Sequence, residues 1–227
     1  MGKVGGASRK RLSFDEVKAT IAFDQPKLNA VRDGRDIIVQ GSLLLVEDDD
    51  SASPAGPISE FDVKIVIDDR YPKQEPRVFE VGERIPRCAD RHINPDGACC
   101  VTIWEDWLLR ADDTSFAAFM NGPLREFFLG QYWFERTGKW PFGERPHYED
   151  GLVEAFADVL GISQKKKDVI YYLRLLAQPW PKGHWMCPCG SGHILRHCHK
   201  DNLNVLHGKV PPNMAKRMLR RLNFSSK

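Results

Sequence analysis

Apolar and polar residues alternate along the first third of the chain in the way that β-strands require. The stretch 61–67, Phe-Asp-Val-Lys-Ile-Val-Ile, has the two-residue period of a strand with one buried face. The aliphatic, β-branched stretches Asp36 to Val46 and Arg77 to Val81 predict further strands. We therefore expect an antiparallel meander of at least three strands. A short helix should precede it, with Ser13 as the N-cap for Glu16.

The pattern changes to a helical period in the second half of the chain. We expect helices over 115–134, over Tyr148 to Leu160 and over Gln164 to Ala177, the first of them broken or bent near Gly122-Pro123. Between strands and helices, Cys88 to Asp112 shows no sustained periodicity and predicts a loop. Together these elements indicate an α+β fold.

The amino-acid composition indicates which classes of protein and partner to expect. The 227 residues suffice for one or two domains, and 42% hydrophobic with 28% charged residues is typical of a soluble globular protein. A net charge of +2 demands neither nucleic acid nor a membrane as partner, although basic residues gather at both ends, in Lys3 to Arg11 and Lys216 to Arg221. No apolar run is long enough to span a membrane, and the basic N-terminus lacks the apolar stretch of a secretory signal.

The six cysteines fall into two tight groups and not into the even spread of a disulfide framework. The groups are Cys88, Cys99 and Cys100, and Cys187, Cys189 and Cys198. Without an export signal, this grouping favours reduced cysteines in the cytoplasm that carry metal or thiol chemistry.

The first cysteine group ends a recognisable series of motifs. Tyr71-Pro72 is followed by Pro76-Arg77-Val78, then by His92-Ile93-Asn94, and finally by Gly97-Ala98-Cys99-Cys100. This series resembles the ubiquitin-conjugating enzyme family, with its Tyr-Pro-x-x-x-Pro-x-Val, His-Pro-Asn and Gly-x-x-Cys motifs, over roughly Leu12 to Leu160. Here Ile93 replaces the proline of His-Pro-Asn, and the stretch from Asn94 to Cys100 is two residues shorter than usual.

The resemblance implies a catalytic set of Cys100, Asn94 and His92. Cys100, three residues after Gly97, inherits the role of the nucleophile that carries a thioester, and an exposed thiolate on a glycine-permitted turn suits that chemistry. The Asn94 amide would donate to the oxyanion. Alternatively, Asn94 only holds the loop through backbone hydrogen bonds, and His92 has a structural role as well. Cys88 and Cys99 are expected to be buried and to fill space.

Two aromatic features near this series have simpler interpretations. Trp104 and Trp107 are expected to pack the loop onto the fold. The segment from Trp140 to Glu144, with His147, follows the long helix and is a candidate gate near the cysteine.

The second cysteine group resembles the SEC-C metal-binding motif. Cys187-Pro188-Cys189-Gly190-Ser191-Gly192 is followed by His197-Cys198-His199. We expect a closed, structural zinc site with the ligands Cys187, Cys189, Cys198 and His199. His197 is the alternative fourth ligand, and His184 and His193 would lie outside the site. Because the segment after Pro181 has few apolar residues, zinc should be what orders it.

These motifs predict four parts of the chain. They are a flexible basic tail (1–11), a ubiquitin-conjugating-like catalytic domain with an antiparallel β-meander flanked by helices (12–162), a connecting helix (163–180) and a zinc module with a C-terminal helix (181–227).

The favoured function is a bacterial conjugating enzyme that accepts a protein C-terminus as a thioester on Cys100 and passes it to an amine. The resemblance extends to components of anti-phage operons, in which the protein that donates its C-terminus is a cyclic GMP–AMP synthase-like nucleotidyltransferase. No Gly-x-Gly-x-x-Gly of an adenylating domain occurs, so the carboxyl group must be activated elsewhere. The alternatives are a silent relative that binds a protein partner and an adaptor built on the zinc module. Low charge and few aromatic residues around that module argue against nucleic acid.

Overall fold

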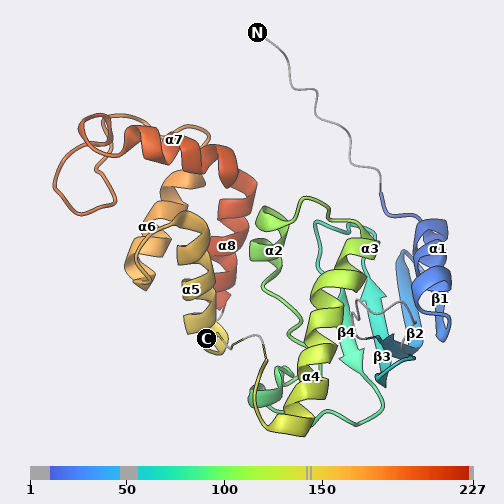
Figure 1. Cartoon of the computed structure of the whole chain (residues 1–227). Coiled ribbons are helices and arrows are strands. Elements are labelled where there is room, and N and C mark those ends of the chain that lie inside the picture. The colour runs from blue at the N-terminus through green and yellow to red at the C-terminus, as the bar shows by residue number, and fades with distance from the viewer. Residues whose placement is uncertain (1–10, 47–55, 142, 144, 225–227) are drawn as a thin grey trace. The chain divides into compact units, whose positions relative to one another are not determined.

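The computed structural model describes residues 11–46, 56–141, 143 and 145–224. Some residues of the chain lie outside this part. They include the first ten residues of the predicted basic tail, the polar residues Asp48 to Asp50 and Ser53 to Ala55, and Phe142 and Glu144 of the candidate gate. The chain divides into two compact units, one of Met1–Thr102 and Asp113–Phe142, the other of Ile103–Asp112 and Gly143–Lys227 (Figure 1).

The first unit is built on a four-stranded antiparallel sheet in the order β1-β2-β3-β4, so consecutive strands are neighbours. Its strands are β1 (Leu28–Asp33), β2 (Asp36–Leu45), β3 (Ser59–Ile67) and β4 (Arg77–Glu80). In the register, Val39 of β2 is paired with Ile65 of β3, and Ile65 with Val78 of β4. The predicted antiparallel meander is confirmed, with β1 as an additional strand.

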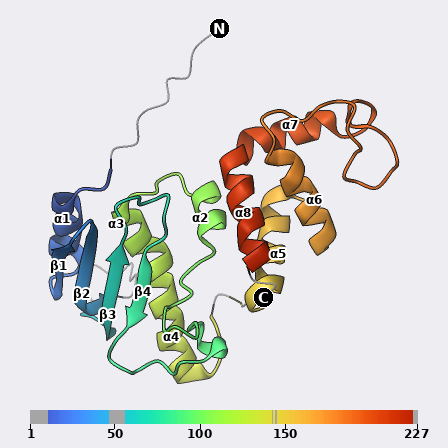
Figure 2. The ribbon, with the colours of Figure 1, turned by 180° about the vertical axis from the view of Figure 1, so that it is seen from behind.

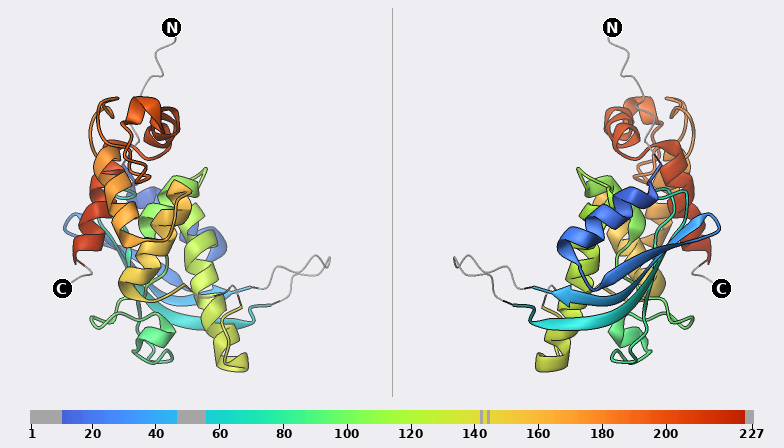
Figure 3. Two further views of the ribbon diagram at one scale, coloured as in Figure 1. Left: turned by 90° about the vertical axis from the view of Figure 1, so that its left-hand side faces the viewer. Right: turned by 90° about the vertical axis from the view of Figure 1, so that its right-hand side faces the viewer.

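Helices cover one face of this sheet. On β3 the residues Phe61, Val63, Ile65 and Ile67 are buried, while Glu60, Asp62 and Lys64 between them are exposed. Helix α1 (Phe14–Asp24) and helix α4 (Arg125–Thr137) lie on the same side of the sheet (Figure 3). The rings of Phe61 and Phe128, from β3 and α4, have centroids 5.0 Å apart. The Ser13–Glu16 capping box that begins α1 was predicted and is present.

The long helix of the first unit is interrupted where the sequence predicts a bend. Helix α3 (Phe116–Phe119) passes through a π-helical turn, η2 (Met120–Leu124), into α4. Pro123 lies inside this turn, and because proline has no backbone N–H the regular hydrogen-bond pattern cannot continue through it. Ser115, the N-cap of α3, is held by Tyr71, whose hydroxyl donates to the Ser115 carbonyl at 2.9 Å.

The second unit is helical (Figure 2), and its buried apolar residues form one core. Its elements are α2 (Trp104–Arg110), α5 (Tyr148–Leu160), α6 (Lys166–Leu176), the 3-10 turn η3 (Leu195–His197), α7 (Lys200–Lys209) and α8 (Pro212–Phe224). The bounds of α5 agree with the prediction. The core combines Val169 and Leu173 of α6 with Leu195, Met218 and Leu222 from the C-terminal segment.

Two elements differ from the sequence-based expectation. The region 104–110 was predicted to be a loop, but it is helix α2. This helix has no side-chain N-cap and is stabilised by the burial of Trp104 and Glu105. Seven residues are too few for a helical period to show in the sequence. Strand β1 was not predicted because five of its six residues are at least partly exposed, so it lacks a two-residue apolar pattern.

The predicted domain limits also differ from the two units. Helix α5 was placed in the domain 12–162, and 163–180 was expected to be a connecting helix. In the structure α5 and α6 are core elements of the second unit, together with the segment 181–227 that was treated as a separate module. No helix in the described ranges has both the length and the apolar character needed to cross a membrane.

Candidate functional site

Residues 92–100 form a narrow hairpin beside β4. The Cys100 N–H donates to the His92 carbonyl and the Asn94 N–H to the Ala98 carbonyl, each at 2.8 Å. The turn is closed by the Gly97 N–H, which donates to the Asn94 carbonyl at 2.8 Å. Gly97 has a φ of 83°, a conformation that other residues rarely adopt. The glycine of the motif is therefore required by the backbone of this turn.

The hairpin separates the two adjacent cysteines. The Cys99 N–H donates to the Val78 carbonyl of β4 at 2.8 Å, which ties this residue to the sheet. Successive side chains of an extended chain point in opposite directions, so Cys99 is buried and Cys100 is exposed. Burial raises the pKa of the Cys99 thiol to about 12. Cys99 therefore stays a protonated thiol near neutral pH, and Cys100 is the cysteine of this pair that solvent and a partner can reach.

The other two predicted site residues lie in the same hairpin. Asn94 is exposed, and its backbone groups make the hydrogen bonds that define the turn. His92 is half-buried with a φ of 52°, and its ring meets that of Trp140 edge-on with centroids 4.7 Å apart. The structure thus brings His92, Asn94 and Cys100 into one loop and shows that the backbones of His92 and Asn94 help to shape it.

Trp140, a member of the candidate gate, is held on α4. Its ring lies 5.1 Å from that of Phe134. A Cβ atom at Gly130 would come within 2.9 Å of the same indole. Trp140 is therefore a packed neighbour of His92.

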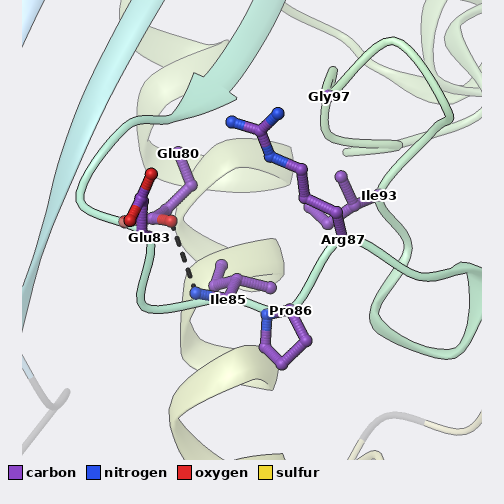
Figure 4. Close-up of a pocket in the computed structure, with 7 residues that line it drawn as sticks. All are labelled: Glu80, Glu83, Ile85, Pro86, Arg87, Ile93 and Gly97. Atoms are coloured by element: carbon purple, nitrogen blue, oxygen red, sulfur yellow. Dashed lines mark hydrogen bonds between the residues drawn. The ribbon is translucent and has the colours of Figure 1, made fainter.

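A small pocket borders the hairpin (Figure 4). Its volume is about 190 Å³, and its charged lining residues are Glu80, Glu83 and Arg87. The Glu80 carboxylate accepts hydrogen bonds from the backbone N–H groups of Gly82, Arg84 and Ile85 and so shapes the loop after β4. Arg87 and Gly97 line this pocket from different loops (Figure 4).

The second cysteine group converges on a single point in the second unit. One donor atom from each of Cys187, Cys189, Cys198 and His199 lies within 4.8 Å of the others. Cys187 Sγ is 3.3 Å from His199 Nδ1, and Cys189 Sγ is 3.5 Å from Cys198 Sγ. These separations are close to the ~3.8 Å expected between ligands that share a tetrahedral zinc at about 2.3 Å. The donor set of three thiols and an imidazole fits zinc.

The loop around these ligands is folded tightly. The Cys187 N–H donates to the His193 carbonyl at 2.8 Å, and Gly190 and Gly192 have φ values of 78° and 75°. His199, the preferred fourth ligand, belongs to the group, whereas His197 is not among its members. Cys187 is buried in the core of the unit, so the site is attached directly to the helices.

One residue beside the first site was not anticipated from the sequence. Gln131, on α4, is fully buried and bonded to Arg91, the residue before His92. The helical period of the sequence could have predicted that Gln131 is buried. Gln131 lies three residues after Phe128 and four after Phe127, so it shares the buried face of α4. A polar residue at such a position requires a hydrogen-bond partner.

Comparison with known families supports the E2-like character of the first unit. Residues 41–142 match the family described as prokaryotic E2 domain. The match includes the hairpin with Cys100 and covers somewhat less than half of the chain. No curated protein and no solved structure matches the chain. The family match and the four-stranded antiparallel sheet flanked by helices support an E2-like fold for this part of the chain.

Proposed function

We propose that this protein is a thioester-forming conjugating enzyme with Cys100 as its nucleophile. The observation that carries the proposal is the placement of Cys100, exposed at the end of a rigid hairpin within the E2-like segment, while the neighbouring Cys99 is buried with a raised thiol pKa. The thiolate of Cys100 attacks the carbonyl carbon of an activated protein C-terminus, an S–C bond forms, and the activating group leaves.

Transfer then regenerates the thiol. An acceptor amine attacks the thioester carbonyl, the C–S bond breaks, and the amine proton passes to solvent as an amide forms. Because a thioester is already activated, positioning contributes more than strong base catalysis. Asn94, exposed in the same hairpin, is the proposed oxyanion donor, and His92 shapes the loop that carries both residues.

The proposed donor is a bacterial protein with a flexible C-terminus, a cyclic GMP–AMP synthase-like nucleotidyltransferase in anti-phage defence. The support is the resemblance of the motif series to conjugating enzymes of such operons together with the prokaryotic E2 match. We propose that a separate activating enzyme supplies the activated C-terminus.

Replacing Cys100 with Ser should trap the donor. A serine oxyester resists thiols, so the Cys100→Ser variant, expressed with its operon neighbours, should carry a thiol-resistant adduct. Mass spectrometry of that adduct should identify the C-terminal peptide of a nucleotidyltransferase. An adduct with another protein would overturn the donor assignment, and the absence of any adduct while wild-type conjugates form would overturn the role of Cys100.

We further propose that Cys187, Cys189, Cys198 and His199 hold a structural zinc ion in a SEC-C-like module. Four protein ligands leave no position for a substrate, so the metal would stabilise the loop and would not act in transfer. The buried Cys187 connects this loop to the core formed by α5, α6 and α8.

Elemental analysis of the purified protein should find about one zinc per chain. Cys189→Ser should lose the metal, whereas Cys88→Ser, an exposed cysteine outside the group, should retain it. Chelation should increase amide exchange over 183–199 and spare α6 and α8, because Leu173 and Met218 remain buried in the apolar core. A metal-free protein with a fully protected 183–199 segment would contradict the assignment.

A further inference from the structure

Gln131 is a polar side chain with no exposure to solvent. Its Nε2 donates to the Arg91 carbonyl at 2.8 Å, and its Oε1 accepts from Arg91 Nε at 2.8 Å. Leaving a buried amide unpaired costs about 1–3 kcal/mol, so the two bonds fix the relative positions of both residues. A single side chain of α4 therefore holds the backbone and the guanidinium of Arg91 at once.

Other α4 residues complete the support of Arg91. The guanidinium lies over the Phe134 ring at 4.8 Å, and Arg91 Nη2 is 3.6 Å from Glu135 Oε1. Arg91 itself is only 9% exposed. Its conformation is thus determined by α4, although it belongs to the short turn η1 (Ala89–Arg91) that precedes the hairpin.

The support extends from Arg91 to the nucleophile through one residue. His92 follows Arg91, and its carbonyl accepts the Cys100 N–H at 2.8 Å. The ring of His92 meets Trp140, which lies close over Gly130, the neighbour of Gln131 on α4. Gln131 thus holds Arg91 directly, Trp140 packs between Gly130 and His92, and the backbone amide of Cys100 is bonded to His92.

We propose that Gln131 is a positioning residue for the reaction at Cys100, acting through Arg91 and the His92 carbonyl. This inference rests on the proposed thioester chemistry. Gln131 is buried and would not touch a substrate; its effect is to keep the Cys100 thiolate aligned with an incoming carbonyl. A displacement of about 1 Å at a reacting atom can cost about 10²-fold in rate, so loss of this support should appear mainly in the maximal rate.

Gln131→Glu tests the proposal with little change in volume. The introduced carboxylate can still accept from Arg91 Nε but repels the Arg91 carbonyl, to which Gln131 now donates. When the carboxylic acid is protonated, the donor returns. The charged groups near this position are Arg91, Glu135 and Arg84, which pairs with Glu135 at 2.7 Å; His92 adjoins Arg91.

The matched control is Gln25→Glu. The side-chain amide of Gln25 also makes two hydrogen bonds to a single residue. Its Nε2 donates to the Leu44 carbonyl at 3.0 Å, and its Oε1 accepts from the Leu44 N–H at 2.8 Å. It ties the end of α1 to β2 and has no bond to the hairpin. Both variants should lose stability, but only Gln131→Glu should disturb Cys100.

The probe is a glycine-terminated peptide thioester of 2-mercaptoethanesulfonate, whose thiolate leaves when Cys100 attacks. We expect Gln131→Glu to lower the maximal rate of acyl uptake at pH 8 by at least about 10-fold relative to Gln25→Glu, with an unchanged half-saturating probe concentration. Equal rates in the two variants would overturn the proposal.

A second readout does not depend on conjugation. Amide exchange measured by NMR should show loss of protection at the Cys100 N–H in Gln131→Glu and not in Gln25→Glu. Unchanged protection of this amide overturns the positioning role even if the enzyme is active. If wild-type protein takes up no acyl group, the proposed function fails, and the exchange comparison still decides whether Gln131 holds the hairpin.

Discussion

Replacing Cys100 with Ala should abolish acyl uptake from a peptide thioester, whereas Cys99→Ala should retain the wild-type rate within about twofold. The reason is the thiolate population. With a pKa near 12, about one Cys99 thiol in 10⁴ is ionised at pH 8, and its side chain is buried against the sheet. Cys100 is exposed on the opposite side of the same extended segment.

Rates of uptake followed by intact-protein mass spectrometry check this prediction. Cys99→Ala removes one buried sulfur and should cost about 1 kcal/mol of stability, so its melting temperature is measured in parallel. Cys88→Ala, another exposed cysteine of the first group, is the control for nonspecific acylation and should behave like the wild type. An inactive, folded Cys99→Ala protein beside an active Cys100→Ala protein would reverse the assignment.

Removing the carboxylate of Glu105 should destabilise the second unit by about 3 kcal/mol. Glu105 is 1% exposed and accepts from Arg217 Nε at 2.5 Å and from Arg221 Nη1 at 2.9 Å, which joins α2 to α8. Glu105→Ala removes the buried carboxylate to which both Arg217 and Arg221 donate. Replacing both arginines with Met should cost at least as much, because the carboxylate itself would then be buried without a counter-charge.

A second ion pair on α2 provides the matched control. Arg110 pairs with Asp106 at 2.6 Å one turn apart, and the Arg110 side chain is half exposed. Exposed pairs of this kind contribute about 0.3–0.5 kcal/mol, so Arg110→Ala should change little. Urea unfolding followed by the NMR signals of residues in the second unit measures both effects. Equal effects of Glu105→Ala and Arg110→Ala would contradict a structural role for the buried cluster.

The same cluster changes the expectation for shortened chains. A chain ending near Pro179 would retain the whole of the domain 12–162 that the sequence predicts. Such a chain lacks Met218 and Leu222 of the core and both arginine partners of Glu105. Since α2 begins at Trp104, four residues after Cys100, loss of α8 removes the anchor of the helix that directly follows the nucleophile. Point substitutions are therefore the better test of the C-terminal segment.

The sequence predicted the features that local patterns specify. The alternation in 61–67, the cap at Ser13 and the helical period of 148–160 each determine an element, and each element is present. The family's Gly-x-x-Cys motif singled out Cys100, which the structure shows to be exposed while Cys99 is buried; the role of Cys100 as nucleophile stays a prediction. The ligand spacing in 187–199 likewise indicated a group of donors that the fold brings together.

The remaining features depend on contacts between distant parts of the chain. Helix α2 is stabilised by residues more than a hundred positions away, and the support of Arg91 by Gln131 spans 40 positions. No repeating pattern in a single sequence indicates which distant residues are in contact. The placement of α5 in the second unit has the same origin, because an apolar helix does not reveal which core it joins.

The proposed function requires that Cys100 carries an acyl group as a thioester. Intact-protein mass spectrometry of the wild-type protein after incubation with the glycine-terminated peptide thioester tests this requirement. The mass should increase by one peptidyl group, located at Cys100 by peptide mapping, reversed by excess thiol and absent from Cys100→Ala. An unmodified Cys100 in folded protein, or a thiol-labile adduct that persists in Cys100→Ala, would contradict it.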